Sequence, residues 1–105
     1  MLEVIREYAH VMSEQRKLKE TGYAAISYID HYSDGRKAEG TEDFSLERYR
    51  NQVVERSVYL PTGKHNKGGK QIWDFAGTVR ARNAINCGKI ARLVFPGQQV
   101  SIRQY

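Results

Sequence analysis

The segment from Gly63 to Lys70 gathers three lysines and three glycines, and it is the first place in this sequence where chemistry is expected. A glycine-rich loop cradles nucleotide phosphates when Lys and then Ser or Thr follow the second conserved glycine directly. Counted from Gly63, Lys70 comes one position late, and Gln71 stands where the hydroxyl residue should be. The spacing therefore argues against nucleotide hydrolysis. It favours a flexible basic loop that contacts nucleic-acid phosphates, and the alternative is a solvated hairpin loop.

Catalytic and metal-binding arrangements have little support in the sequence. The histidines are His10, His31 and His65, and no two of them have metal-ligand spacing. The single cysteine, Cys87, is predicted to pack as a small buried side chain and not to act as a nucleophile. We therefore expect no catalytic residue, no metal site, no cofactor and no enzymatic activity. A nuclease or small hydrolase is the least supported class, because Asp74 is the only acid after residue 60.

Charge is divided unevenly along the 105 residues, whose net charge is +5. Residues 1–60 hold nine Lys and Arg against eleven acids, whereas residues 61–105 hold eight against one. Such asymmetry points to a polyanionic partner, since each cation held near a phosphate releases counterions. The alternative is that the acidic half folds back beside the basic half and the net charge serves solubility. The predicted phosphate-binding residues are Lys64, Lys67, Lys70, Arg80, Arg82, Lys89, Arg92 and Arg103.

The chain is also rich in tyrosine, with seven residues, beside one tryptophan and three phenylalanines. Aromatic rings close to basic residues are typical of base-stacking surfaces and also of protein–protein hot spots. For most of these rings we favour simple packing at the edges of a small core. The set considered is Tyr23, Tyr28, Tyr32, Tyr49, Tyr59, Trp73, Phe75 and Tyr105.

The first third of the chain predicts a helix followed by a strand. Apolar residues at three- and four-residue spacing indicate an amphipathic helix over residues 2–20, with Ile5, Tyr8 and Met12 buried and Gly22 ending it. Residues 23–33 alternate with period two, as in a strand. In a strand, the acid, base and hydroxyl groups of residues 30–34 would point alternately to opposite faces, which argues against a catalytic group there. Residues 34–43 are predicted to be a polar loop.

The remaining segments complete a predicted α+β fold. We expect a short helix near residues 43–51 capped by Thr41 or Asp43, strands at 53–60 and 71–80, and a mobile loop at 61–70. Residues 81–88 are unclear, with one helical turn as an option, and residues 89–95 and 99–105 form a hairpin. The predicted architecture is a single domain, residues 1–105, in which the N-terminal amphipathic helix packs on a small, mostly antiparallel sheet of four to five strands.

The expected location is a reducing compartment, the cytoplasm. No apolar run approaches the roughly 20 residues of a membrane-spanning helix, and the first residues carry acids where a signal peptide would be basic and then apolar. A lone cysteine cannot form a disulfide framework within the chain.

Two function classes follow from these observations. The first is a small basic protein that binds DNA or RNA, mainly through phosphates contacted by its C-terminal half. The alternative is a non-enzymatic protein-interaction module, such as an inhibitor or accessory factor that docks on a larger protein or nucleoprotein complex. In that case the aromatic residues and the segments 33–43 and 61–70 would make the contact.

Overall fold

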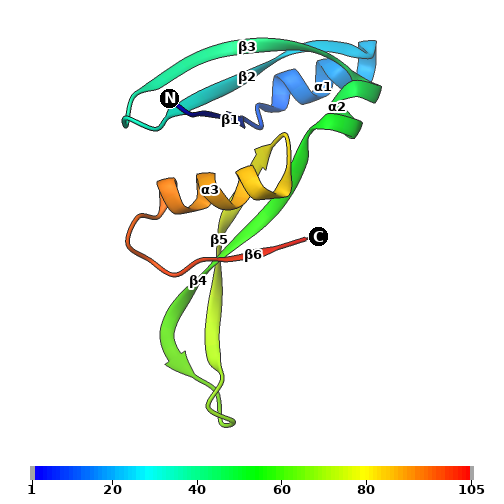
Figure 1. Ribbon diagram of the computed structural model, residues 1–105. Coiled ribbons are helices and arrows are strands. Elements are labelled where there is room, and N and C mark those ends of the chain that lie inside the picture. The colour runs from blue at the N-terminus through cyan, green and yellow to red at the C-terminus, as the bar shows by residue number, and fades with distance from the viewer. Residues whose placement is uncertain (1, 105) are drawn as a thin grey trace.

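The computed structural model describes residues 2–104, in which two three-stranded antiparallel sheets combine with three helices (Figure 1). The first sheet has the order β1-β2-β3 and the second the order β5-β4-β6. In chain order the elements are β1 (Val4–Tyr8), α1 (Met12–Thr21), β2 (Tyr23–Tyr32), β3 (Lys37–Ser45), α2 (Leu46–Gln52), β4 (Val54–His65), β5 (Gln71–Ala81), α3 (Ala84–Val94) and β6 (Ser101–Arg103).

The α+β class is confirmed, but the single sheet of four to five strands is wrong. Each sheet has its own hydrophobic core. One core packs α3 on β4 and β5 and includes Val58, Cys87 and Ile90; the other packs α1 against β2 and β3 and includes Leu18 and Phe44. No helix within residues 2–104 is long and apolar enough to cross a membrane.

The predicted helix over residues 2–20 is also wrong, because its first part is strand β1. Ile5 and Tyr8 are both buried, as predicted, but they lie on opposite faces of the strand. Ile5 joins the core under α3, and Tyr8 joins the core with Phe44. A strand buried on both faces therefore produced the three-residue spacing that is otherwise typical of a helix.

Helix α1 begins at Met12, whose side chain is 67% exposed and not buried as predicted. Its one buried residue is Leu18, which packs in the core with Phe44. The predicted end of the helix is confirmed, since Gly22 adopts a left-handed φ of 82° and its N–H donates to the Leu18 carbonyl.

Strand β3 occupies most of the segment predicted as a polar loop. One face of this strand is exposed to solvent, and its inner face carries one large apolar side chain, Phe44. Gly40 pairs with Tyr28 on β2, and a Cβ built on Gly40 would lie 2.5 Å from the Tyr28 hydroxyl oxygen. The Tyr28 side chain therefore covers this part of β3. Because Gly40 has no apolar side chain of its own, the hydrophobic pattern of the sequence did not predict the strand.

The predicted strands at 23–33, 53–60 and 71–80 correspond to β2, β4 and β5. The predicted short helix is α2, and its cap is Ser45 instead of Thr41 or Asp43, because the Ser45 hydroxyl accepts a hydrogen bond from the Arg48 N–H at 3.1 Å.

The predicted C-terminal hairpin is wrong, because residues 84–94 form helix α3. The Asn83 side chain caps it by accepting a hydrogen bond from the Asn86 N–H at 2.7 Å. Cys87, Ile90 and Ala91 repeat at helical spacing and are fully buried. After the turn at Gly97, the short strand β6 pairs with β4. The last residue of the predicted hairpin, Tyr105, lies outside the described residues.

Strands β4 and β5 continue beyond the rest of the fold as a two-stranded hairpin, which projects from the molecule in Figure 1. We call its outer part, residues 59–75, the arm. The radius of gyration is 15.8 Å, and the molecule measures 50 × 36 × 20 Å. A compact chain of this length would have a radius of gyration of about 13 Å, so the arm makes the molecule elongated.

Candidate nucleic-acid interface

The end of the arm is a closed turn and not the open loop expected over residues 61–70. Strand β4 continues to His65, and the Asn66 N–H donates to the Lys70 carbonyl at 2.8 Å. The Asn66 side-chain oxygen accepts hydrogen bonds from the N–H groups of Gly68 at 2.9 Å and Lys70 at 3.0 Å. Such an Asx turn fixes the backbone of the residues that it spans. The lysines at the tip are therefore presented from a defined backbone.

Lys64, Lys67 and Lys70 are all exposed at this tip. Among the described residues, none of these three lysine side chains has an ion pair. Asp74 is the only acid in the arm, and it lies at the end nearer the body. The tip therefore carries positive charge that no acid of the described chain neutralises by direct contact.

The other predicted phosphate-binding residues divide into two groups. Three are paired with acids. Arg80 Nε lies 2.8 Å from the Glu55 carboxylate, in an ion pair whose geometry does not form a hydrogen bond. Arg82 pairs with Glu42, and Lys89 Nζ lies 2.9 Å from the Glu3 carboxylate. The remaining two have no acid partner within residues 2–104. Arg92 is exposed on α3, and Arg103 on β6 lies over the Tyr59 ring, 4.2 Å from its centroid. The structure thus does not bring all eight residues onto one surface.

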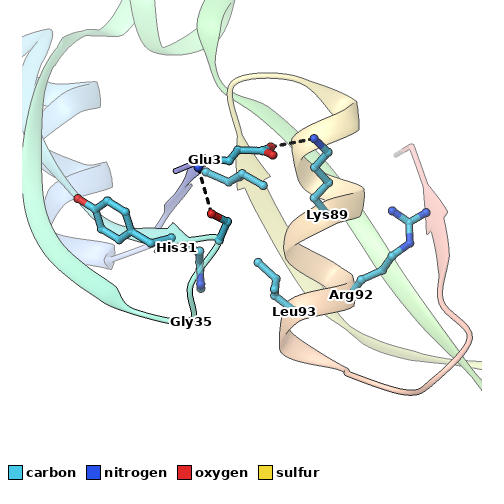
Figure 2. Close-up of a pocket in the computed structure, with 9 residues that line it drawn as sticks. Glu3, His31, Gly35, Lys89, Arg92 and Leu93 are labelled. Atoms are coloured by element: carbon cyan, nitrogen blue, oxygen red, sulfur yellow. Dashed lines mark hydrogen bonds and ion pairs between the residues drawn. The ribbon is translucent and has the colours of Figure 1, made fainter. Parts of the chain in front are cut away.

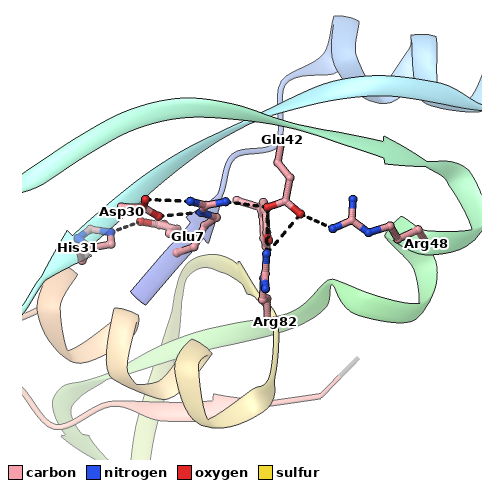
Figure 3. A network of polar contacts seen from close by, with 8 residues as sticks. Glu7, Asp30, His31, Glu42, Arg48 and Arg82 are labelled. Atoms are coloured by element: carbon pink, nitrogen blue, oxygen red, sulfur yellow. Dashed lines mark hydrogen bonds and ion pairs between the residues drawn. The ribbon is translucent and has the colours of Figure 1, made fainter. Parts of the chain in front are cut away.

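Arg82 belongs to a network centred on the Glu42 carboxylate (Figure 3). Glu42 accepts hydrogen bonds from Arg6 at 2.9 Å, Arg48 at 2.7 Å and the Tyr8 hydroxyl at 3.0 Å, while Arg82 approaches at 3.3 Å. The Arg82 Nε–H also donates to the Tyr8 hydroxyl at 3.1 Å. Arg82 follows β5, whereas Glu42 lies on β3, so the network joins the two sheets.

The electrostatics of this network favour its charged state. Burial raises the pKa of Glu42, but hydrogen bonds from Arg6 and Tyr8 and the charge of Arg82 outweigh burial, and the pKa lies below its ordinary value. The pKa of Tyr8 is raised by burial, against the lowering effect of the Arg82 hydrogen bond. Arg6 forms two hydrogen bonds with Asp30, at 2.8 and 3.0 Å. We assign these residues a structural role.

The packing that the sequence favours for most of the eight aromatic residues is found at Tyr28 and Tyr49, which border the core with Phe44. Phe44 makes edge-to-face contacts with Tyr8 and Tyr49, and the Arg6 guanidinium lies over the Tyr28 ring at 3.6 Å. Tyr23 is an exception, with 70% exposure on the outer face of β2. Three others, Tyr59, Trp73 and Phe75, gather on the arm. Tyr105 lies outside the described residues.

The residues considered for catalysis are held in structural positions. Cys87 is fully buried, and burial raises the pKa of its thiol, which disfavours the nucleophilic thiolate. Asp30 and His31 point to opposite faces of β2, where Asp30 pairs with Arg6 and His31 Nε2 lies 2.8 Å from Glu7. Within residues 2–104, no group of three or more His, Cys, Asp or Glu residues could hold a metal ion.

A pocket of about 350 Å³ lies between α3 and the turn that joins β2 to β3 (Figure 2). Glu3 borders it, with its carboxylate paired to Lys89 and its backbone N–H donating to the Ser33 hydroxyl at 3.1 Å. Arg92 extends away from His31, toward the other side of α3 (Figure 2). The charged groups at this pocket are therefore engaged or turned outward, which leaves the tip of the arm as the stronger candidate site.

Comparison of the chain with protein-family models, with curated proteins and with solved structures found no match. The fold and the exposed charge define a small basic α+β protein with a projecting two-stranded arm.

Proposed function

We propose that this protein binds nucleic acid and that the tip of the β4–β5 arm makes the main phosphate contacts. The observation that carries the proposal is the set of three exposed lysines, Lys64, Lys67 and Lys70, without an acid partner in the described residues. A free ammonium group can approach a phosphate without first breaking an internal ion pair. The arm also holds these groups away from the acidic half of the chain, which would otherwise compete for them.

The remaining basic residues have different roles in this proposal. Arg92 and Arg103 supply additional contacts, because neither has an acid partner within the described residues. Arg80, Arg82 and Lys89 are primarily structural, since using them on a phosphate would cost the ion pairs that they make with acids. The protein is not an enzyme in this proposal and requires no metal or cofactor.

The test is binding of a fluorescent oligonucleotide, followed by anisotropy over a series of salt concentrations. Three phosphate contacts predict a slope of log affinity against log salt of about −2 on a single strand and about −3 on a duplex. A steeper slope would add Arg92 and Arg103 to the contact. Absence of measurable binding at low salt would contradict the proposal.

A second candidate function, docking on a protein, is favoured by apolar exposure on α3. Ile85 is 72% exposed and Leu93 is 52% exposed, although both are large apolar side chains. Exposed apolar surface is a feature of protein-binding sites. This candidate replaces the first if the protein binds no oligonucleotide at low salt.

A further inference from the structure

We infer that the arm binds single-stranded nucleic acid by stacking bases on an aromatic face formed by Tyr59, Trp73 and Phe75. This inference rests on the proposed function and narrows it to one class of nucleic acid. It depends on a different set of residues from the tip lysines, so the two can fail separately.

The register of the hairpin places the three rings on one face of the arm. Tyr59 pairs with Phe75, and Pro61 pairs with Trp73, with no register shift between these two pairs. Directly paired residues of an antiparallel ribbon point to the same side, as do residues two apart along one strand. The Tyr59 and Phe75 rings meet edge to face, with their centroids 5.6 Å apart.

These rings are not needed to fill either core. Phe75 is 59% exposed, Trp73 is half-buried, and neither belongs to the clusters that hold α3 or α1 on the sheets. A large ring in such a position leaves apolar surface open to water. The face of a nucleobase has a complementary shape and is attracted to an aromatic ring whatever the base.

Charge at both ends of the aromatic face decides what kind of partner fits it. Lys70 lies in the turn just before β5, three residues from Trp73, which is at most about 10 Å along an extended chain. At the other end, Arg103 lies over the Tyr59 ring. A second copy of the chain would bring like charges together on this face. A polyanion with flat, exposed rings instead complements both the aromatic rings and the positive charge beside them. A single strand offers those rings; a duplex keeps them stacked internally.

Fluorescence gives a direct readout, because Trp73 is the only tryptophan in the chain. Titration of the intact protein with a single-stranded oligothymidylate, which forms no internal pairs, should quench the Trp73 emission. A duplex of the same length should bind through phosphates with little quenching.

The decisive variant is Phe75→Leu, which keeps an apolar side chain but removes the ring. Each stacked base contributes about 1–3 kcal/mol, so affinity for the single strand should fall by about fivefold to 150-fold. Affinity for the duplex should stay within about twofold, and Phe75→Tyr should restore single-strand binding. Tyr23→Leu, which removes a comparably exposed ring from β2, away from the arm, serves as the control and should leave both affinities unchanged.

Three outcomes would overturn the inference. If wild-type protein binds with the expected salt dependence but Phe75→Leu has no effect and Trp73 is not quenched, stacking is wrong and phosphate binding stands. If Phe75→Leu weakens single strand and duplex equally, the ring does not discriminate between them. If neither nucleic acid binds at low salt, the proposed function fails and the inference fails with it.

Discussion

Glu42 shows how single residues hold the two sheets together. Its side chain is 12% exposed and accepts hydrogen bonds from three arginines and a tyrosine. Because Arg82 approaches it from the end of β5, the carboxylate connects segments 40 residues apart in the sequence. An acid that receives so many donors contributes to stability only while it is ionised.

The first prediction concerns Glu42→Gln, which should lower the free energy of unfolding at neutral pH by about 2–4 kcal/mol, because it leaves partly buried arginines without their counter-charge. The pKa of Glu42 in the folded protein lies below its ordinary value of 4.5, so its stabilisation is present above 4.5 and is lost as the pH falls through the folded pKa. Urea unfolding at neutral and strongly acidic pH should therefore show the difference between variant and wild type shrink in acid.

A matched control for Glu42 is Asp34→Asn. Asp34 also pairs with an arginine, Arg36, but both side chains are exposed. Exposed pairs contribute about 0–1 kcal/mol, so this variant should unfold close to wild type at either pH. Equal effects of the two substitutions would contradict the structural role assigned to the Glu42 network.

Cys87 provides the second residue-scale prediction. Its Sγ lies 3.4 Å from the Val54 carbonyl oxygen in the core under α3, and burial raises the pKa of the thiol. We expect Cys87→Ala to cost about 1–2 kcal/mol of stability, as removal of a small buried group does, and to leave oligonucleotide affinity unchanged. In the folded wild type, the thiol should react slowly with an alkylating reagent. A folded Cys87→Ala protein that no longer binds would contradict the packing role.

Among the elements, β1 carries the strongest test of the fold, since it contributes to both cores. Ile5→Ala should cost about 2–4 kcal/mol, because it opens a cavity in the core under α3. Met12→Ala is the contrasting change: this side chain is 67% exposed, and its removal should alter stability by less than about 0.5 kcal/mol. Urea unfolding of both variants measures the difference. Similar effects of the two substitutions would instead favour a continuous amphipathic helix over residues 2–20.

The elements differ in how far the sequence could reveal them. Strand β2 was predictable because its alternating residues follow one uninterrupted strand. Strand β3 was not, since its buried face depends on Gly40 being covered by Tyr28 from the neighbouring strand. Helix α3 could have been predicted from its Asn83 cap and from the spacing of its buried residues, but Gly88 is a residue type that often interrupts a helix.

The candidate site was predictable in part for a similar reason. The clustering of lysines at 64–70 is a local property of the sequence. The neutralisation of Arg82 and Lys89 is not, because Glu42 and Glu3 lie 40 and 86 residues away from them. Composition therefore identified the basic half, and only the three-dimensional structure separated its exposed charges from its paired ones.

At the scale of the whole molecule, shape and charge lead to the same element. The chain extends over 50 Å, and the arm places its lysine-bearing tip away from the cores (Figure 1). Positive charges that make no ion pair among the described residues also occur elsewhere on the surface, at Lys17 and Lys19 on α1 and Lys37 on β3. If net charge alone drove binding, either group of lysines would serve equally well.

The most direct measurement is therefore the salt dependence of oligonucleotide binding by two matched triple variants. One carries Lys64→Ala, Lys67→Ala and Lys70→Ala at the tip; the other carries Lys17→Ala, Lys19→Ala and Lys37→Ala on the body, with the same reduction in charge.

We predict that the tip variant binds more weakly and that its log–log slope becomes shallower by up to about two on a single strand and about three on a duplex, as three phosphate contacts are lost. The body variant should keep a slope close to that of wild type, and both variants should unfold within about 0.5 kcal/mol of it. Two folded variants with the same slope would contradict the assignment of phosphate binding to the arm.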